Sequence, residues 1–229
     1  MGGQACVLYG AAEFSRDADF ALLASAANLY RLGQALAELR AEVIAVPPFE
    51  LKYLGKGHAI HFRCFAPEVA GLRIDVMAKM RGLDAFPKLW QRRATLRAED
   101  GTSYQLMSLP DLVTAKKTQR DKDWPMIRRL VEADYFRNRD QPKRQQLRFW
   151  FLELRTPELL LEVASAHSGL CRRLFKRRPL LKFAALGKEN ALIEALSKEE
   201  KAEREADRRY WAPLKVELGE LRHERLRTG

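Results

Sequence analysis

Three aspartates inside short apolar runs constrain the fold of this chain more than any other feature of it. Asp17 and Asp19 lie in DADFALLA and Asp75 lies in LRIDVM, two runs that predict strands. Residues two apart in a strand point to the same face, so Asp17 and Asp19 are expected side by side, roughly 7 Å apart at the backbone. Adjacent carboxylates repel each other unless a cation lies between them. Taken alone, the pair is also compatible with a strand end that reaches solvent.

Asp75 favours the interpretation of these residues as a cation site, because a charge flanked by apolar residues in a strand has to be paired or coordinated. Three carboxylates from neighbouring strands can hold two Mg²⁺ ions about 3.5 to 4 Å apart, the arrangement that clamps the attacking and leaving oxygens in phosphoryl transfer. Asp17, Asp19 and Asp75 are therefore the candidate metal ligands and catalytic residues.

Two glycines, Gly2 and Gly3, stand ahead of these aspartates, and a short helix is expected over residues 4–12. A glycine turn that leads into a helix presents backbone N–H groups to an anion and lets a phosphate approach without a Cβ clash. The opening stretch thus combines a candidate phosphate site with a candidate metal site.

Gly2, Gly3, Asp17, Asp19 and Asp75 stand in an order and spacing that resembles the DNA polymerase β-like nucleotidyltransferase superfamily. Its signature is Gly-Gly or Gly-Ser, a gap that holds a helix, Asp-x-Asp or Asp-x-Glu, and a third Asp on a later strand. The resemblance implies that the two glycines hold nucleotide phosphates and that the three aspartates hold two Mg²⁺ ions.

The resemblance also bears on the start of the chain, because the family carries a strand before its glycines. We expect a domain that lacks this first strand, or a natural chain that begins upstream of Met1. A glycine motif at Gly10-Ala11 is a rival alignment, but it leaves five residues before Asp17, too few for the family's helix. Ser15, just before the first aspartate, joins the candidate phosphate-binding residues.

A second segment, SLPDLVTAKKTQRDKDW, resembles the helix that follows the hairpin in minimal nucleotidyltransferases and in the nucleotidyltransferase-like toxins of bacterial toxin–antitoxin and abortive-infection systems. The matching positions are Lys116, Arg120, Lys122 and Asp123. On one helix Lys116 and Arg120 would share a face suited to bind a triphosphate, with Asp123 orienting a basic side chain. The alternative for these residues is a solvated basic helix.

The rest of the pattern predicts an α+β fold, a nucleotidyltransferase-like mixed sheet with helices, followed by an all-α segment. A helix is expected over residues 28–42, strands near 43–46, 58–65 and 71–78, and a hairpin in AEDGTSYQLMSL. From about residue 138 strand signals end, and the last two helices are expected to separate at Trp211-Ala-Pro213. The predicted domains are 1–137, nucleotidyltransferase-like, and 138–229, helical.

The formal charge of +11 favours an anionic partner. The run Arg172 to Arg178 could contact RNA, with Phe149 to Phe151 stacking on bases, although such residues are more often a solvated face and a helix core. His58 and His61 are three apart in a strand-like run, hence on opposite faces, so a shared metal is not expected. Three widely spaced cysteines, and the lack of a signal or membrane-spanning pattern, favour a reducing cytoplasm over a disulfide framework or membrane.

The resemblance implies Mg²⁺-dependent transfer of a nucleoside monophosphate from an NTP to an acceptor hydroxyl on RNA such as tRNA, on a protein or on a small molecule. It also implies a cognate toxin or antitoxin as a partner. The alternative is a catalytically inactive member of the fold that binds nucleotide, nucleic acid or a partner protein.

Overall fold

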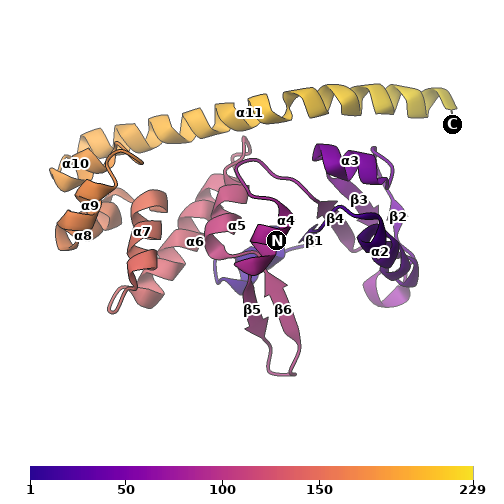
Figure 1. Ribbon diagram of the computed structural model, residues 1–229, viewed down its shortest axis with the longest axis horizontal. Coiled ribbons are helices and arrows are strands. Elements are labelled where there is room, and N and C mark those ends of the chain that lie inside the picture. Colours follow the sequence, from indigo (N-terminus) through magenta and orange to yellow (C-terminus); the bar gives the residue numbers. More distant parts are fainter. Residues whose placement is uncertain (229) are drawn as a thin grey trace. The chain divides into compact units, whose positions relative to one another are not determined.

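A computed structural model describes residues 1–228 and shows an α+β fold with a mixed four-stranded sheet (Figure 1). The chain divides into two compact units, the first formed by Met1–Ala115 with the chain from Arg209 onward, and the second by Lys116–Arg208. The predicted domains, 1–137 and 138–229, were based on the change in sequence pattern. They stay a prediction, and their bounds differ from those of the two compact units.

The main sheet belongs to the first unit and has the strand order β1-β4-β3-β2. Its strands are β1 (Asp17–Ala21), β2 (Glu42–Val43), β3 (Ile60–Arg63) and β4 (Arg73–Met77). β1 runs parallel to β4, whereas β3 is antiparallel to both β4 and β2. The two strands that carry the aspartates are therefore direct neighbours.

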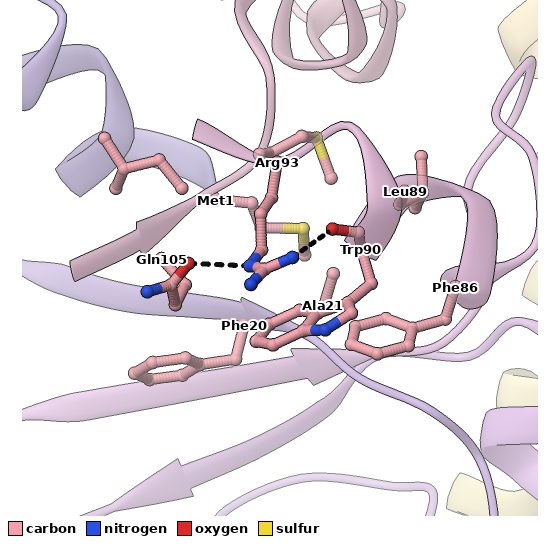
Figure 2. A pocket seen from close by; sticks show the side chains of 10 residues that line it. Met1, Phe20, Ala21, Phe86, Leu89, Trp90, Arg93 and Gln105 are labelled. Atoms are coloured by element: carbon pink, nitrogen blue, oxygen red, sulfur yellow. Dashed lines mark hydrogen bonds between the residues drawn. The ribbon is translucent and has the colours of Figure 1, made fainter. Parts of the chain in front are cut away.

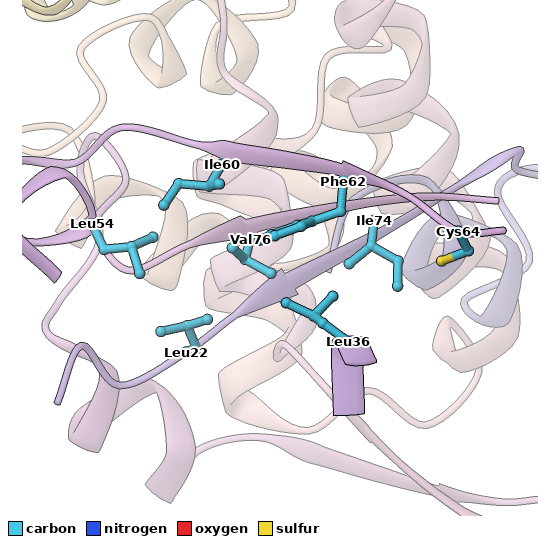
Figure 3. Close-up of a cluster of buried hydrophobic side chains, with 8 residues drawn as sticks. All are labelled: Leu22, Leu36, Leu54, Ile60, Phe62, Cys64, Ile74 and Val76. Carbon is cyan, nitrogen blue, oxygen red and sulfur yellow. The ribbon is translucent and has the colours of Figure 1, made fainter. Parts of the chain in front are cut away.

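Apolar side chains at alternate strand positions form the core of this unit. Ile60 and Phe62 of β3 and Ile74 and Val76 of β4 pack with residues from the helices and loops beside the sheet (Figure 3). The full cluster is Leu22, Leu36, Leu54, Ile60, Phe62, Cys64, Ile74 and Val76. Because side chains alternate between the faces of a strand, the residues between these positions lie on the opposite face.

The remaining elements of the first unit are short. Its helices are α1 (Gly2–Leu8), α2 (Ala26–Glu38), α3 (Leu51–Lys56), the 3-10 turn η1 (Pro67–Val69), α4 (Phe86–Gln91) and α5 (Leu109–Lys116). A hairpin follows α4, with β5 (Ala94–Arg97) paired to β6 (Ser103–Leu106). Gly101 of the predicted turn has a φ of 85°, and the amide of Thr102 donates to Oδ1 of Asp100 at 2.8 Å, which explains the Asp-Gly signal.

The regular elements of the second unit are all helices, joined by short loops. Its helices are α6 (Asp123–Asn138), α7 (Arg144–Glu153), α8 (Pro157–Ala166), α9 (Ser168–Arg173), α10 (Leu181–Ala185) and the part of α11 (Glu189–Thr228) that ends at residue 208. Trp150 and Phe151 are buried in its core, so these two aromatic side chains cannot stack on RNA bases. Among residues 1–228 no helix is both long and apolar enough to cross a membrane.

The predicted break at Trp211-Ala-Pro213 is wrong, because α11 is continuous through Pro213. An interior proline costs about 3 kcal/mol in a helix, so the following segment has to be stabilised by tertiary contacts. His58 Nε2 lies 2.9 Å from Oε2 of Glu217, and Lys56 is also paired with that carboxylate. These contacts within the first unit help to keep the helix intact beyond the proline.

Candidate functional site

The three predicted aspartates lie on one face of two adjacent strands. Asp19 of β1 is paired in register with Asp75 of β4, and Asp17 is paired with Arg73. Ala18 and Ile74 form the register pair between these two, and they belong to the apolar face that packs against the core. The carboxylates therefore occupy the face opposite the core, as the alternation in the sequence indicated.

The two glycines lie directly against the Asp-Ala-Asp strand. A Cβ added to Gly2 would lie 1.9 Å from Oδ2 of Asp19, and one added to Gly3 would lie 2.3 Å from Oγ of Ser15. Gly2 also has a φ of 64°, a conformation that side-chain-bearing residues rarely adopt. Both positions exclude a side chain, because α1 starts in contact with the strand that it precedes.

Hydrogen bonds hold the first turn of α1 against β1. The amide nitrogen of Gly3 donates to Oδ2 of Asp19 at 3.3 Å, and the amino group of Met1 donates to the carbonyl oxygen of Asp19 at 2.7 Å. Oγ of Ser15 donates to the carbonyl oxygen of Asp17 at 3.0 Å. In this arrangement the first turn of α1 binds a carboxylate, at the place where the resemblance puts a phosphate.

Asp75 is held by two neighbours that we did not predict. Nδ1 of His61 lies 2.8 Å from Oδ1, and Arg73 donates to Oδ1 from Nε at 2.9 Å and to Oδ2 from Nη2 at 3.2 Å. Burial alone would raise the pKa of Asp75, but the hydrogen bonds from His61 and Arg73 outweigh it and hold the pKa below its usual value. Asp75 is therefore a carboxylate that stays ionised.

Arg73 is the cation of this face. Its pKa is raised above the usual value, first by the hydrogen bond to Asp75, and also by the charges of Asp75, Asp17 and Asp19. Arg73 stands two residues before Asp75 on the same strand, so the period of a strand places both on one face. The spacing of two residues between Arg73 and Asp75 could therefore have predicted this ion pair from the sequence.

The two histidines have separate roles. His61 lies opposite Asp75 in the β3–β4 ladder, whereas His58 is buried and pairs with Glu217. The two histidines thus contact different carboxylates. The role of His61 depends on which strand pairs with β4, which the sequence pattern left open.

Lys116, Arg120 and Asp123 form a cluster in the second unit, but not on one helix. α5 ends at Lys116 and α6 begins at Asp123, so the predicted shared helical face of Lys116 and Arg120 is wrong. The connecting loop instead turns both side chains toward Asp123. Oδ1 of Asp123 accepts from Nζ of Lys116 at 3.2 Å, and Oδ2 accepts from Nε of Arg120 at 2.8 Å.

Asp123 is the centre of this cluster and is 1% exposed. Burial raises its pKa, but the charge of Lys116, a hydrogen bond from Thr118 and the charge of Arg120 outweigh burial and hold the pKa below its usual value. The buried carboxylate thereby fixes the two basic side chains.

The carboxylate face fits Mg²⁺ in donor type, because hard divalent cations prefer carboxylate oxygens. Asp17, Asp19 and Asp75 provide such oxygens from neighbouring strand positions. Over residues 1–228 the side chains do not form a ready-made group of three or more metal ligands. Both oxygens of Asp75 already accept from Arg73, so a cation at Asp75 requires that guanidinium to move aside.

The chain was compared with protein-family models, with curated proteins and with solved structures, and none of the three comparisons found a match. The geometry of the carboxylate face and its glycines therefore carries the functional argument.

Proposed function

We propose that the protein is a Mg²⁺-dependent nucleotidyltransferase, which transfers a nucleoside monophosphate from an NTP to an acceptor hydroxyl and releases pyrophosphate. One observation carries the proposal. Gly2 and Gly3 contact the strand that bears Asp17 and Asp19, and this strand pairs in register with the one that bears Asp75. Residues from three separate segments thus meet in the combination that the resemblance to the superfamily requires.

The three aspartates have distinct roles in this proposal. Asp17 and Asp19 would hold both metal ions. Asp75 would hold one of them and accept the proton of the acceptor hydroxyl, once Arg73 has released its oxygens. When bound, Mg²⁺ supplies positive charge that offsets the charge developing on the phosphate oxygens. The low pKa of Asp75 supports its part as a ligand, because the carboxylate is ionised at neutral pH.

The remaining candidates position the nucleotide. The first turn of α1, where the Gly3 amide donates to Asp19, is the proposed phosphate-binding segment, and Ser15 lies beside it. The resemblance implies that Lys116 and Arg120 neutralise the leaving pyrophosphate. Within the second unit Asp123 orients both side chains. The acceptor is RNA, a protein or a small molecule, and the excess of basic residues favours RNA or an acidic partner such as a cognate antitoxin.

A second candidate function is supported by Arg73. Its guanidinium already provides the positive charge that Asp75 needs, so this carboxylate is paired without a metal ion. This arrangement favours a catalytically inactive member of the fold that binds nucleotide, nucleic acid or a partner protein.

The two functions are separated by incubating the full chain with each α-labelled NTP, Mg²⁺ and either total RNA or lysate protein. The transferase labels a macromolecule, and Asp17→Ala abolishes the label while circular dichroism shows an intact fold. Bound nucleotide without any label on a macromolecule would instead favour the binding protein.

A further inference from the structure

An open pocket lies beside the carboxylate face, and the proposed function gives it no role (Figure 2). It is lined by β1, by α4 and by the hairpin, and we name it the aromatic pocket. The residues that matter for its chemistry are Phe20, Ala21, Phe86, Trp90, Arg93 and Gln105.

The aromatic pocket is built from flat groups. The rings of Phe86 and Trp90 are stacked, with centroids 5.8 Å apart and an interplanar angle of 24°. The guanidinium of Arg93 lies over one face of the Trp90 ring, 4.0 Å from its centre, so a planar ligand that stacks on Trp90 has to use the other face or displace the guanidinium. Trp90 is 45% exposed, although burial of such surface is favourable. Exposed aromatic surface in a concave site suits a planar ligand that covers it.

Polar groups at the edge of the aromatic pocket are hydrogen-bond donors. Arg93 donates from Nε to Oε1 of Gln105 and from Nη1 to the carbonyl oxygen of Trp90, both at 2.7 Å (Figure 2). In the hydrogen bonds found for residues 1–228, Nη2 of Arg93 and Nε2 of Gln105 have no acceptor. These two donors face solvent beside the rings, and they suit a heteroaromatic ring with carbonyl oxygens on its edge.

The position of the aromatic pocket fits a nucleotide bound at the carboxylate face. Ala21, which lines the pocket, follows Asp19 by two residues on β1, so its side chain lies on the same face roughly 7 Å further along the strand. A nucleotide with its phosphates beside Asp17 and Asp19 can therefore direct its base toward Phe86 and Trp90.

We infer that the aromatic pocket binds the nucleobase of the NTP, by stacking on the Phe86–Trp90 pair and by hydrogen bonds from Arg93 and Gln105 to a carbonyl edge. The inference rests on the proposed function for the location of the phosphates. It adds a base subsite and a preference for uracil, guanine or cytosine over adenine, which has no carbonyl oxygen.

The test measures binding to the full chain by calorimetry, with UTP, GTP, CTP, ATP and inorganic triphosphate as probes, in the presence of Mg²⁺. Trp90→Ala is expected to weaken the binding of UTP, GTP or CTP by about 5- to 150-fold, the range seen when a stacking aromatic is removed. Trp90→Phe keeps a ring and is expected to restore most of the affinity. Inorganic triphosphate, which has no base, is expected to bind all three proteins equally.

Tyr30→Ala is the matched control, because Tyr30 is a 70% exposed aromatic residue on α2 that does not line the pocket. It is expected to leave every affinity unchanged. If Trp90→Ala binds all four NTPs as tightly as the wild type, the inference is wrong. It is equally wrong if Trp90→Ala raises only the KM of the acceptor.

The outcomes also separate the inference from the function on which it rests. Trp90-dependent binding of NTP without transfer of label supports the base subsite and contradicts the transferase. Transfer of label, together with an NTP affinity that Trp90→Ala leaves unchanged, supports the transferase and overturns the base subsite. A wild-type protein that binds no nucleotide overturns both.

Discussion

At the scale of single residues, buried carboxylates and guanidiniums organise both units. Arg178 is 3% exposed and donates from Nη1 to the carbonyl oxygens of Phe151 and Leu154 at 3.0 and 2.9 Å. Its Nε and Nη2 donate to Glu199 at 3.0 and 2.7 Å. The guanidinium thereby satisfies carbonyl groups at the end of α7 and pairs with a carboxylate of α11, a combination that stabilises a helix C-terminus.

Arg178→Ala is expected to lower the free energy of unfolding by about 3 kcal/mol, because it leaves two buried carbonyl groups without a donor and removes one partner of Glu199. The neighbouring residue Arg177 is exposed, so Arg177→Ala is the matched control, with an expected change within about 0.5 kcal/mol. Urea unfolding followed by tryptophan fluorescence measures both. Equal stability of the two variants would show that Arg178 is not a structural residue.

Asp123 gives a prediction that depends on pH. Its pKa in the folded protein is below the unfolded value of about 4, so its ionised form stabilises the fold at neutral pH. That contribution is complete above the unfolded pKa and is lost as the pH falls through the lower, folded pKa. Asp123→Asn is expected to cost roughly 2 kcal/mol at pH 7, mainly through Lys116, since the more exposed Arg120 is screened by solvent.

The measurement is the difference in the free energy of unfolding between wild type and Asp123→Asn, followed from pH 7 into the acid range below about pH 4. The difference is expected to shrink only in that acid range. A difference that stays constant with pH would mean that the charge of Asp123 does not stabilise the protein.

Residue-scale prediction succeeded where one segment contains the signal and failed where two segments have to meet. Asp17, Asp19 and Asp75 stood out because each interrupts an apolar strand run. His61 did not stand out, because its contact with Asp75 depends on the pairing of β3 with β4. Arg178 was grouped with an exposed basic run, since nothing in that run shows that backbone carbonyls of α7 surround it.

At the scale of elements, the close contact of α1 with β1 positions the candidate site. The contact needs glycine at position 2, where a Cβ would overlap the carboxylate of Asp19 and φ is positive. Gly33, in the middle of α2, has no atom within 4 Å of a Cβ position. The two glycines are therefore expected to respond to alanine in opposite directions.

Gly2→Ala is expected to lower the free energy of unfolding by about 1–3 kcal/mol, the cost of a strained backbone at a crowded position. Gly33→Ala is expected to raise it by about 0.5–1 kcal/mol, because alanine is the better helix former and meets no obstacle. Urea unfolding of the two variants beside the wild type measures both changes. A Gly2→Ala protein as stable as the wild type would contradict the close contact.

The elements that were predicted are those with a strong local pattern. The alternation near residues 58–65 and 71–78 gave β3 and β4, and the Asp-Gly turn gave the hairpin. α3 was not predicted, because its six residues are too few to show a helical period. The loop between α5 and α6 was predicted as helix because its basic residues favour helices. Local hydrogen bonds from Lys116 and Arg120 to Asp123 form a loop instead, and the helical pattern does not reveal them.

At the scale of the whole molecule, the first unit is discontinuous in sequence. Residues from Arg209 onward belong with Met1–Ala115, and Glu217 pairs with His58 and Lys56 of that unit. A change of composition along the chain marks where strands end, but it does not reveal that a later segment returns to an earlier unit. The helix through Pro213 was missed for the same reason.

The most direct test of the central claim compares two labels on one nucleotide. The full chain is incubated with Mg²⁺, total RNA or lysate protein, and the same NTP labelled at either the α- or the γ-phosphate. If the glycines and the three aspartates form a nucleotidyltransferase site, only the α-label reaches the macromolecule, the γ-label leaves in pyrophosphate, and Asp19→Asn abolishes the transfer. Transfer of the γ-label, or α-label transfer that persists in Asp19→Asn, would contradict the assignment.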